Sequence, residues 1–308
     1  MVATLRFTLW LAVAVVAAAV LGWLFRAVLT RIAPANAARL LRSAPLSASF
    51  GMAVIVFYLL VAILAPTIAP FGEREVVGAQ FMPASSEFLL GTDNLGRDMF
   101  SRLIFGVRNT VSIAFITTAL AFAVGAVLGL LAATVSGWID QLLSRVVDVL
   151  MAIPALIFQL LLLTIVGTSI INMILVIALI DSTRVFRLAR AVAMNIVVMD
   201  YIEAAKLRGE GLWRLIIREI MPNAAAPLVA EFGLRFCFVF LSISALSFLG
   251  LGIQPPTADL GSMVRDNATL ITFGEVTPLL PAGAIALLTV AVNFVVDWML
   301  HRASGLKE

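Results

Sequence analysis

Residues 199–222 read MDYIEAAKLRGEGLWRLIIREIMP, a charged segment that lies between two apolar stretches near residues 169–190 and 227–252. A helix needs about 20 mostly apolar residues to cross the hydrocarbon core of a bilayer. Each flanking stretch is long enough, so the charged segment is interpreted as a loop at a membrane surface. This arrangement indicates a helical membrane protein.

The composition of the whole chain agrees with this interpretation. Of its 308 residues, 62% are apolar and 13% are charged, whereas soluble chains are about half apolar and a quarter charged. The sequence lacks the short alternating strands of a β-barrel, and helices satisfy their own backbone hydrogen bonds in lipid. We therefore predict an all-α polytopic membrane protein with seven spans, near residues 7–25, 50–70, 110–135, 146–166, 169–190, 227–252 and 277–300.

Residue counts exclude several chemistries. Cys237 is the one cysteine and His301 the one histidine, which excludes an intramolecular disulfide, a cysteine metal cluster and the usual zinc sites. Neither of the two lysines, Lys206 and Lys307, follows a glycine, so the phosphate-binding loop GxxxxGK(S/T) is absent. We expect no metal site and no cofactor on this chain, and another subunit would have to supply energy for any driven process.

Charges in the connecting segments predict the orientation. Segment 26–45 carries four arginines and no acid, and segment 184–219 carries seven basic residues against four acids. The connections 71–105 and 253–276 are richer in acids. Because basic residues gather on the cytoplasmic side, we expect a cytoplasmic C-terminus and, with seven spans, an N-terminus outside. The net charge of +3 then follows from topology, and nucleic acid is excluded as a partner.

The first apolar stretch has competing interpretations. Ala35-Asn-Ala37 resembles a signal-peptidase site, and Arg6 precedes the apolar run. However, a signal peptide has a shorter apolar region, and it lacks basic residues such as Arg26 and Arg31 before the cleavage site. We predict a retained helix with a basic linker over residues 1–45. A helix that lies flat on the membrane and a cleaved one are the alternatives.

The quoted loop is expected to contain two helices. Glu203 to Arg208 favours a helix, and Gly209 with Gly211 permits a reversal of the backbone. Apolar residues then recur at helical spacing until Pro222, which is expected to end the second helix. A basic amphipathic element of this kind either rests on anionic lipid or docks onto a cytoplasmic protein. Composition alone leaves both possibilities open.

The segment resembles the EAA loop of inner-membrane permease subunits of binding-protein-dependent ABC importers. The residues that carry this resemblance are Glu203-Ala204-Ala205, Gly209 and Ile220-Met221-Pro222. In that family the loop forms coupling helices that insert into a groove of the ATP-hydrolysing subunit. The resemblance implies that Glu203 caps or pairs at the docking helix, that both alanines permit close approach and that Gly209 makes the turn. The implied coupling residues are Glu203, Ala204, Ala205, Gly209, Ile220 and Pro222.

Further segments narrow the family. Signatures of the dipeptide/oligopeptide/nickel group, specifically of its second or C-type permease, resemble three segments of this chain: residues 90–108, 137–154 and 246–257. The resemblance as a whole covers roughly residues 40–302. It implies a six-helix type I permease core with one extra N-terminal helix. The implied organisation is an extra helix and linker at 1–45, a first core helix at 46–70, an extracytoplasmic loop at 71–109, a permease domain at 110–302 containing the coupling loop 195–225, and a cytoplasmic tail at 303–308.

The resemblance also implies a function and a set of partners. The chain would be a non-enzymatic permease subunit of the bacterial inner membrane that forms half of a pathway for peptides or related small solutes. Its implied partners are a second permease in a heterodimer, two subunits that bind ATP and Mg, an extracytoplasmic binding protein and membrane lipid. The alternative is a secondary transporter coupled to an ion gradient.

Two polar groups remain as candidate sites. The outer loop motif consists of Gly91, Asp93, Gly96, Arg97, Asp98 and Arg102, in which glycines and Asx residues predict turns. A polar lattice with a folding role is favoured there over substrate contact. In the spans, Glu231 and Arg235 are spaced to pair on one helix face, and Asp297 is expected to complete the cluster. Arg184, Arg187 and Arg190 are expected to mark the headgroup boundary.

Overall fold

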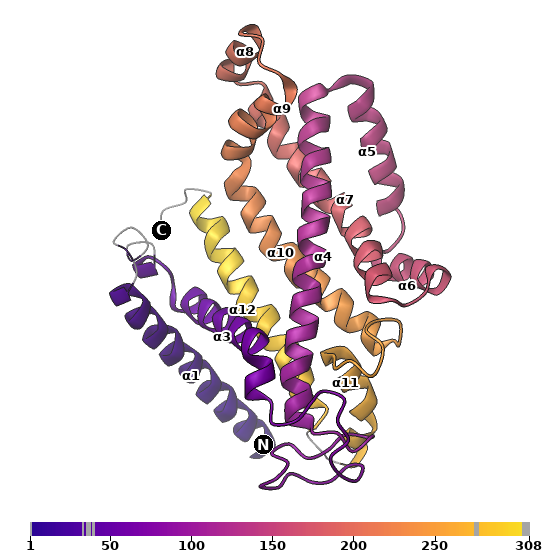
Figure 1. Ribbon diagram of the computed structural model, residues 1–308. Coiled ribbons are helices and arrows are strands. Elements are labelled where there is room, and N and C mark those ends of the chain that lie inside the picture. Colours follow the sequence, from indigo (N-terminus) through magenta and orange to yellow (C-terminus); the bar gives the residue numbers. More distant parts are fainter. Residues whose placement is uncertain (1, 33, 35–37, 39–40, 274–276, 304–308) are drawn as a thin grey trace.

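Figure 1 shows a computed structural model that describes residues 2–32, 34, 38, 41–273 and 277–303. These residues form helices joined by loops, of which the longest runs from residue 69 to 98, and the described β contacts are isolated bridges at Val76–Arg97 and Thr92–Asp98. The all-α prediction is confirmed. The helices are α1 (Val2–Ile32), α3 (Leu46–Ile68), α4 (Met99–Val135), α5 (Gly137–Met151), α6 (Ala155–Val166), α7 (Ile170–Val197), α8 (Asp200–Leu207), α9 (Leu212–Arg214), the π-helix η1 (Leu215–Ile220), α10 (Met221–Phe248), α11 (Leu260–Asn267), the 3-10 helix η2 (Ala268–Phe273) and α12 (Leu279–Ala303).

Fewer straight spans are found than the seven predicted. Within the described part of the chain, four helical segments are long and apolar enough to cross a bilayer: α3, α4, the continuous run Leu212–Phe248 and α12. The predicted span 146–166 is instead a bent pair, because α5 and α6 meet at 87°. The stretch 146–166 thus consists of parts of two helices with different directions, and the predicted span at this position stays a prediction.

The bend between α5 and α6 has a local cause. Pro154 is the N-cap of α6, and Ala152 caps the end of α5. A proline donates no backbone hydrogen bond and disfavours the helical conformation in the residue before it, here Ile153. The apolar stretch is thus divided into two helices with different directions.

The contact between α4 and α7 depends on two glycines one helical turn apart. A Cβ atom on Gly125 would lie 2.4 Å from the carbonyl oxygen of Ser182, and one on Gly129 would lie 2.6 Å from that of Phe186. Small residues at this spacing let helix backbones approach closely in a membrane. The two helices therefore pack as a pair, and together with α10 they extend past α3 and α12 toward α8 (Figure 1).

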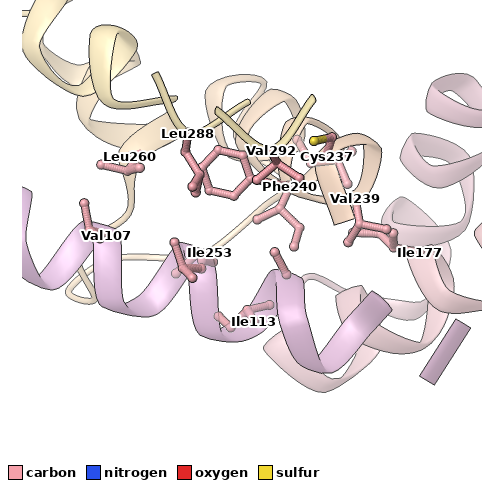
Figure 2. Close-up of a cluster of buried hydrophobic side chains, with 14 of the residues drawn as sticks. Val107, Ile113, Ile177, Cys237, Val239, Phe240, Ile253, Leu260, Leu288 and Val292 are labelled. Atoms are coloured by element: carbon pink, nitrogen blue, oxygen red, sulfur yellow. The ribbon is translucent and has the colours of Figure 1, made fainter. Parts of the chain in front are cut away.

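The main hydrophobic core is centred on α10. Phe240, Ile243 and Leu246 of this helix are fully buried, and Figure 2 shows Phe240 near Leu288 and Val292 of α12. Helices α4, α6 and α7 contribute further buried side chains to the same cluster. Because α10 contacts α4, α7 and α12, it is the central helix of the bundle.

The extra N-terminal helix α1 packs against the first core helix, α3. A Cβ atom on Gly22 would lie 2.7 Å from the carbonyl oxygen of Leu46, and Arg26 Nη1 donates a hydrogen bond of 3.2 Å to the carbonyl oxygen of Ala44. The possible cleavage site at 35–37 and the tail residues 304–308 lie outside the described residues.

Candidate functional site

The two loop regions singled out in the sequence lie at opposite ends of the molecule. Helices α8 and α9 are at one end, whereas α11 and the loop between α3 and α4 are at the other (Figure 1). The long helices α4, α7 and α10 connect these ends (Figure 1). The arrangement agrees with the prediction that segments 195–225 and 71–105 lie on different sides of a membrane.

One face of α8 packs inside the chain. Ile202 and Ala205 are fully buried, whereas Glu203 and Ala204 are exposed. Ala205 therefore packs against its own chain, and Ala204 is the alanine of this pair whose side chain is exposed. The buried cluster at this end combines Ile202 and Ala205 with Leu215, Ile216, Ile220, Ala224 and side chains of α4 and α7.

The opposite face of α8 is exposed and partly apolar. Tyr201, Ala204 and Leu207 are spaced by three residues, so they lie on one side of the helix. Leu207 is 83% exposed at the end of the helix, before the turn. A leucine this exposed, beside a tyrosine and an alanine, forms a small apolar surface that a partner can cover. We refer to Tyr201, Ala204 and Leu207 as the outer face of α8.

Glu203 lies in the first turn of α8. A carboxylate at this position is favoured by the partial positive charge of the helix N-terminus. None of the ion pairs described for the chain includes Glu203; the pairs in this loop join Glu210 to Arg208 and Arg214. Glu203 thus remains an exposed charge next to the outer face of α8.

Gly209 makes the turn after α8. Its φ is +78°, a conformation that favours glycine, and its N–H donates to the carbonyl oxygen of Lys206 at 2.9 Å. The N–H of Glu210 donates to the carbonyl oxygen of Ala205, which closes the end of the helix. Gly211, by contrast, is extended, with φ −69° and ψ 154°. The reversal therefore requires Gly209, and Gly211 has no such role.

Pro222 does not end the helix that precedes it. The run Leu212–Phe248 is continuous, and the π-helix η1 lies just before the proline. In η1 the N–H of Met221 donates to the carbonyl oxygen of Ile216, five residues back. Proline cannot donate to the carbonyl four residues earlier and collides with it, and a π-turn shifts that register. The predicted stop at Pro222 is therefore wrong, because η1 accommodates the proline.

A buried ionic cluster joins α7 to α10. Arg235 Nε lies 2.8 Å from a carboxylate oxygen of Glu231, and Arg235 Nη1 lies 3.5 Å from one of Asp181. The pairing of Glu231 with Arg235 agrees with the prediction. Asp297 is exposed on α12, and the ion pairs described for the chain do not include it. Asp181 is the acid that completes the cluster, in the place expected for Asp297. The sequence offers one indication of this role, which is that Asp181 is an acidic residue within the apolar stretch 169–190.

The three arginines of α7 have different surroundings. Arg187 lies 2.9 Å from Asp148 of α5, and Arg190 Nη2 donates to Asp140 of α5 at 2.6 Å. The guanidinium carbon of Arg184 lies 5.9 Å from the ring centre of Phe238 on α10. Two of the arginines thus hold α5 against α7, rather than simply marking a headgroup boundary.

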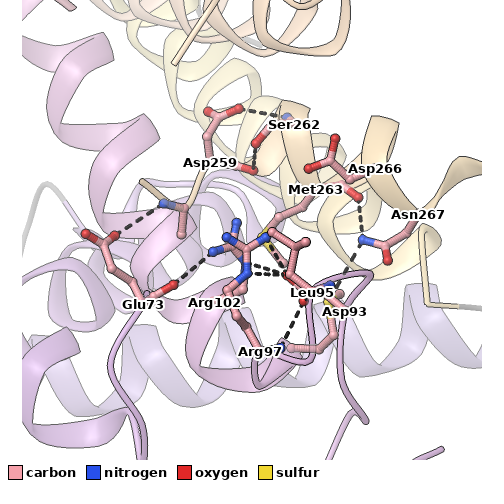
Figure 3. A network of polar contacts seen from close by, with 12 residues as sticks. Glu73, Asp93, Leu95, Arg97, Arg102, Asp259, Ser262, Met263, Asp266 and Asn267 are labelled. Atoms are coloured by element: carbon pink, nitrogen blue, oxygen red, sulfur yellow. Dashed lines mark hydrogen bonds and ion pairs between the residues drawn. The ribbon is translucent and has the colours of Figure 1, made fainter. Parts of the chain in front are cut away.

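The outer loop motif forms the expected lattice. Asp93 is buried and accepts from Arg97 at 2.7 Å, and Arg102 Nε lies 3.2 Å from the same carboxylate (Figure 3). Asp98 caps α4 by accepting from the backbone N–H of Ser101 at 2.7 Å. The charged side chains of the motif thus contact one another and the backbone of the loop, which supports a folding role.

Both glycines of the motif are at turns that other residues do not fit. Gly91 and Gly96 have φ values of +73° and +75°. A Cβ atom would lie 2.3 Å from the carbonyl oxygen of Met82 at Gly91, and 2.1 Å from that of Gly78 at Gly96. Steric contact and backbone conformation together require glycine at these positions.

The outer loop is also joined to the segment before α11. Thr110 Oγ1 donates to Asp259 at 2.9 Å, and Asn109 donates to Glu73 at 3.0 Å and to the carbonyl oxygen of Ala258 at 2.9 Å. Asp259 is fully buried at the N-cap of α11, and this burial raises the pKa of its carboxyl group. Hydrogen bonds therefore join the outer loop to the segment before α11.

Residues 125–303 match the protein family described as "Binding-protein-dependent transport system inner membrane component". This region contains the end of α4 and all the helices from α5 to α12, together with segment 195–225. The match thus covers more than half of the chain.

Named relatives align over most of the chain. The dipeptide transport system permease protein DppC of Haemophilus influenzae is 34% identical over 257 residues, covering 81% of this chain and 87% of that protein. The di/tripeptide transport system permease protein DppC of Pseudomonas aeruginosa is 34% identical over 254 residues, covering 80% and 84%. The glutathione transport system permease protein GsiD of Pectobacterium atrosepticum is 32% identical over 213 residues, covering 69% and 71%.

Proposed function

Because the chain belongs to the family of binding-protein-dependent transport system inner membrane components, we propose that it forms half of the translocation pathway of an ABC importer for peptides or related small solutes. A second permease forms the other half. Two separate subunits bind ATP and Mg, an extracytoplasmic binding protein delivers the solute, and this chain itself holds no cofactor.

The construction of α8 is the observation that carries this proposal. Ile202 and Ala205 join α8 firmly to the rest of the chain, while Tyr201, Ala204 and Leu207 face outward. A helix that is packed on one face and apolar on the other can receive a partner and transmit its movement. The partner that supplies movement in this family of proteins is the ATP-hydrolysing subunit.

The path of coupling follows from the helices that the loop joins. Segment 195–225 lies between α7 and α10, and its buried face packs against both of these helices and α4. The close approach of α4 to α7 at Gly125 and Gly129 ties these two helices together. A displacement of α8 therefore moves α7 and α10 directly and carries α4 with them, which is the movement required for alternating access.

The opposite end receives the binding protein in this proposal. The lattice around Asp93 and the hydrogen bonds of Asn109 and Asp259 hold the two outer segments in one shape. A preformed surface binds a partner without a further loss of conformational freedom. The charged residues of the lattice act here by positioning the surface.

The membrane orientation is proposed from the charge distribution. The chain is a multi-pass protein of the inner membrane, with segment 195–225 in the cytoplasm, segment 71–109 outside, the N-terminus outside and the C-terminus in the cytoplasm. The seven basic residues of 184–219 support this orientation.

Uptake by reconstituted vesicles tests the proposal. The chain would be co-expressed with the ATPase subunits, second permease and binding protein of the same organism, and the complex would be placed in liposomes. We expect uptake of labelled L-alanyl-L-alanine to require ATP and binding protein, and to continue when proton and sodium gradients are collapsed. Uptake that follows an ion gradient without nucleotide would instead establish the alternative, a secondary transporter.

A further inference from the structure

Helix α5 lies at the edge of the bundle, beside α4 and α7 (Figure 1). None of its 15 residues, all of which the structure describes, is buried. Helices α4, α7 and α10, by contrast, contribute the buried side chains of the hydrophobic clusters. Because helices in a membrane are held together by close packing and by interhelical hydrogen bonds, α5 depends on few contacts to keep its position.

Two ion pairs and a cavity lie between α5 and α7. Arg187 Nη2 is 2.9 Å from a carboxylate oxygen of Asp148, and Arg190 Nη2 donates to Asp140 at 2.6 Å. The side chains of Arg187 and Asp148 are about half exposed, and exposed ion pairs contribute little to stability. The cavity has a volume of about 210 Å³ and is lined by Ser144, Val147, Asp148, Phe186, Arg187 and Arg190. The contact between α5 and α7 is therefore polar and incompletely packed.

The opposite face of α5 is apolar. Its exposed apolar side chains recur at helical spacing, namely Trp138, Leu142, Val146 and Val149. Trp138 is 71% exposed and Val149 is 69% exposed. α5 thus directs its polar face toward α7 and its apolar face away from the chain. An outward movement of α5 would cost this apolar face no contact with its own chain.

Both ends of α5 have the backbone features of a hinge. At its start, Ser136 and Gly137 have φ values of +57° and +68°. No other part of the described chain comes within 4 Å of the position that a Cβ atom on Gly137 would take. At its end, the break before Pro154 sets α5 and α6 at 87° to each other. Residues at the ends of helices absorb the changes in φ and ψ when a segment swings, so α5 can rotate about its two ends while α4 stays in place.

Gln159 of α6 indicates a second arrangement of this region. Its side chain is fully buried, one turn before the fully buried Leu163. Neither its amide nitrogen nor its amide oxygen has a hydrogen-bond partner in the part of the chain that the structure describes. A carboxamide is both donor and acceptor, and burial without partners has a cost in free energy. A state in which water reaches α6 removes that cost, so the amide favours such a state.

We propose that α5 is a gate, which swings away from α7 about its two ends during transport. In the closed state the two ion pairs with α7 hold α5. In the open state water enters between the two helices and reaches the amide of Gln159. Because α7 leads directly into segment 195–225, a displacement of that segment shifts the arginines of α7 relative to α5. The inference rests on the proposed function and names the element of this chain that moves.

Distances between spin labels test the movement. The complete transporter would carry nitroxide labels on Trp138→Cys of α5 and Met194→Cys of α7, both at exposed positions, with its native cysteines replaced, Cys237 by alanine. We expect the distance between the labels to differ by about 5 Å, the length of one helical turn, between the nucleotide-free and the vanadate-trapped complex. The matched pair Val127→Cys and Met194→Cys joins α4 to α7, which pack closely, and should keep its distance. An equal distance from position 138 to position 194 in both states would overturn the gate.

Reversible crosslinking tests whether transport needs the movement. In the same background, Asp140→Cys and Arg190→Cys would be joined by a bis-methanethiosulfonate reagent. We expect uptake of labelled L-alanyl-L-alanine to fall in proportion to the fraction crosslinked and to return on reduction, which separates a locked gate from a misfolded subunit. The same reagent on Trp138→Cys and Leu142→Cys, one turn apart on α5 alone, is the matched control and should leave uptake unchanged. Full uptake by the complex crosslinked between positions 140 and 190 would show that α5 stays in place during transport.

Gln159→Leu tests the role of the amide. Leucine has a similar volume and no polar atoms to satisfy, so we expect a higher melting temperature of the complex. We also expect uptake to be slower by about fivefold, because the open state loses a hydrogen-bonding group. Leu163→Met conserves volume one turn later and should change both quantities little. A higher melting temperature with unaltered uptake would contradict hydration of Gln159 in the open state.

The failure of this inference is distinguishable from failure of the proposed function. If the unaltered complex takes up no L-alanyl-L-alanine with ATP, the proposed peptide transport is refuted, and the spin-label distances still report whether α5 moves. If the unaltered complex transports the peptide and the crosslinked complex transports it equally well, the transporter assignment stands and the gate is wrong.

Discussion

Asp181 of α7 and Arg235 of α10 lie 3.5 Å apart inside the bundle, and a carboxylate oxygen of Glu231 lies 2.8 Å from Nε of the same guanidinium. The contact joins the two helices that lead into and out of segment 195–225. Because both side chains are buried, neither charge can be compensated by water. The pair therefore holds α7 and α10 together next to segment 195–225.

Asp181→Asn should destabilise the subunit. Removal of one member of a buried ion pair costs about 3–5 kcal/mol, and since Glu231 remains beside Arg235 we expect the lower end of that range. The measurement is the melting temperature of the purified complex in detergent. Asp148→Asn, which alters an exposed pair with Arg187, is the control and should change the melting temperature little. Equal melting temperatures for the two variants would contradict a stabilising role for Asp181.

Gly96→Ala should disrupt the outer loop more than Gly137→Ala. Both glycines have positive φ values, +75° and +68°, and a left-handed conformation costs a non-glycine residue about 1–2 kcal/mol. Only at Gly96 would the new Cβ atom also meet a backbone oxygen, that of Gly78, at 2.1 Å. Limited proteolysis should cut the loop faster in Gly96→Ala. Similar cleavage in both variants would show that the loop adapts.

Gly209→Val should uncouple the transporter. A β-branched residue is strained at φ +78°, although the space around the glycine is open. Gly209→Asn is the matched variant, because asparagine tolerates this conformation. We expect lower ATPase co-purification and lower uptake for the valine variant only. The interpretation of the turn fails if the valine variant retains both.

Asp259 predicts a pH dependence with a defined sign. Burial raises its carboxyl pKa above the usual 3.8, so the folded state holds its proton more strongly than the unfolded state. Protonated Asp259 therefore contributes to the free energy of unfolding at pH values below the usual pKa. This contribution is lost as the pH rises through the raised pKa of the folded state. Relative to Asp259→Asn, the unaltered protein should therefore melt at a higher temperature at about pH 4 than at about pH 8. The opposite trend would mean that Thr110 and Ser262 keep the carboxylate ionised.

The helical architecture was largely predictable because a bilayer imposes long apolar stretches. The predicted stretches 50–70, 110–135, 227–252 and 277–300 correspond to α3, α4, α10 and α12. The break at Pro154 was missed since hydropathy records how apolar a run is and not its direction.

The candidate sites were predictable where the residues are close in sequence. The turn at Gly209 and the lattice around Asp93 are local, and both are present. The role of Asp181 and the burial of Ala205 depend on residues of other elements, namely Arg235 and the cluster around Leu215. Such contacts leave no local pattern in the sequence.

The coupling claim is tested most directly by photocrosslinking from the outer face of α8. p-Benzoylphenylalanine would replace Leu207, which is 83% exposed, in cells that produce the complete transporter, and the same residue at Phe57 of α3 would serve as the control. We predict an adduct of this chain with an ATPase subunit from position 207 and none from position 57. Adducts from position 207 with lipid alone, in cells that still import the peptide, would contradict the account.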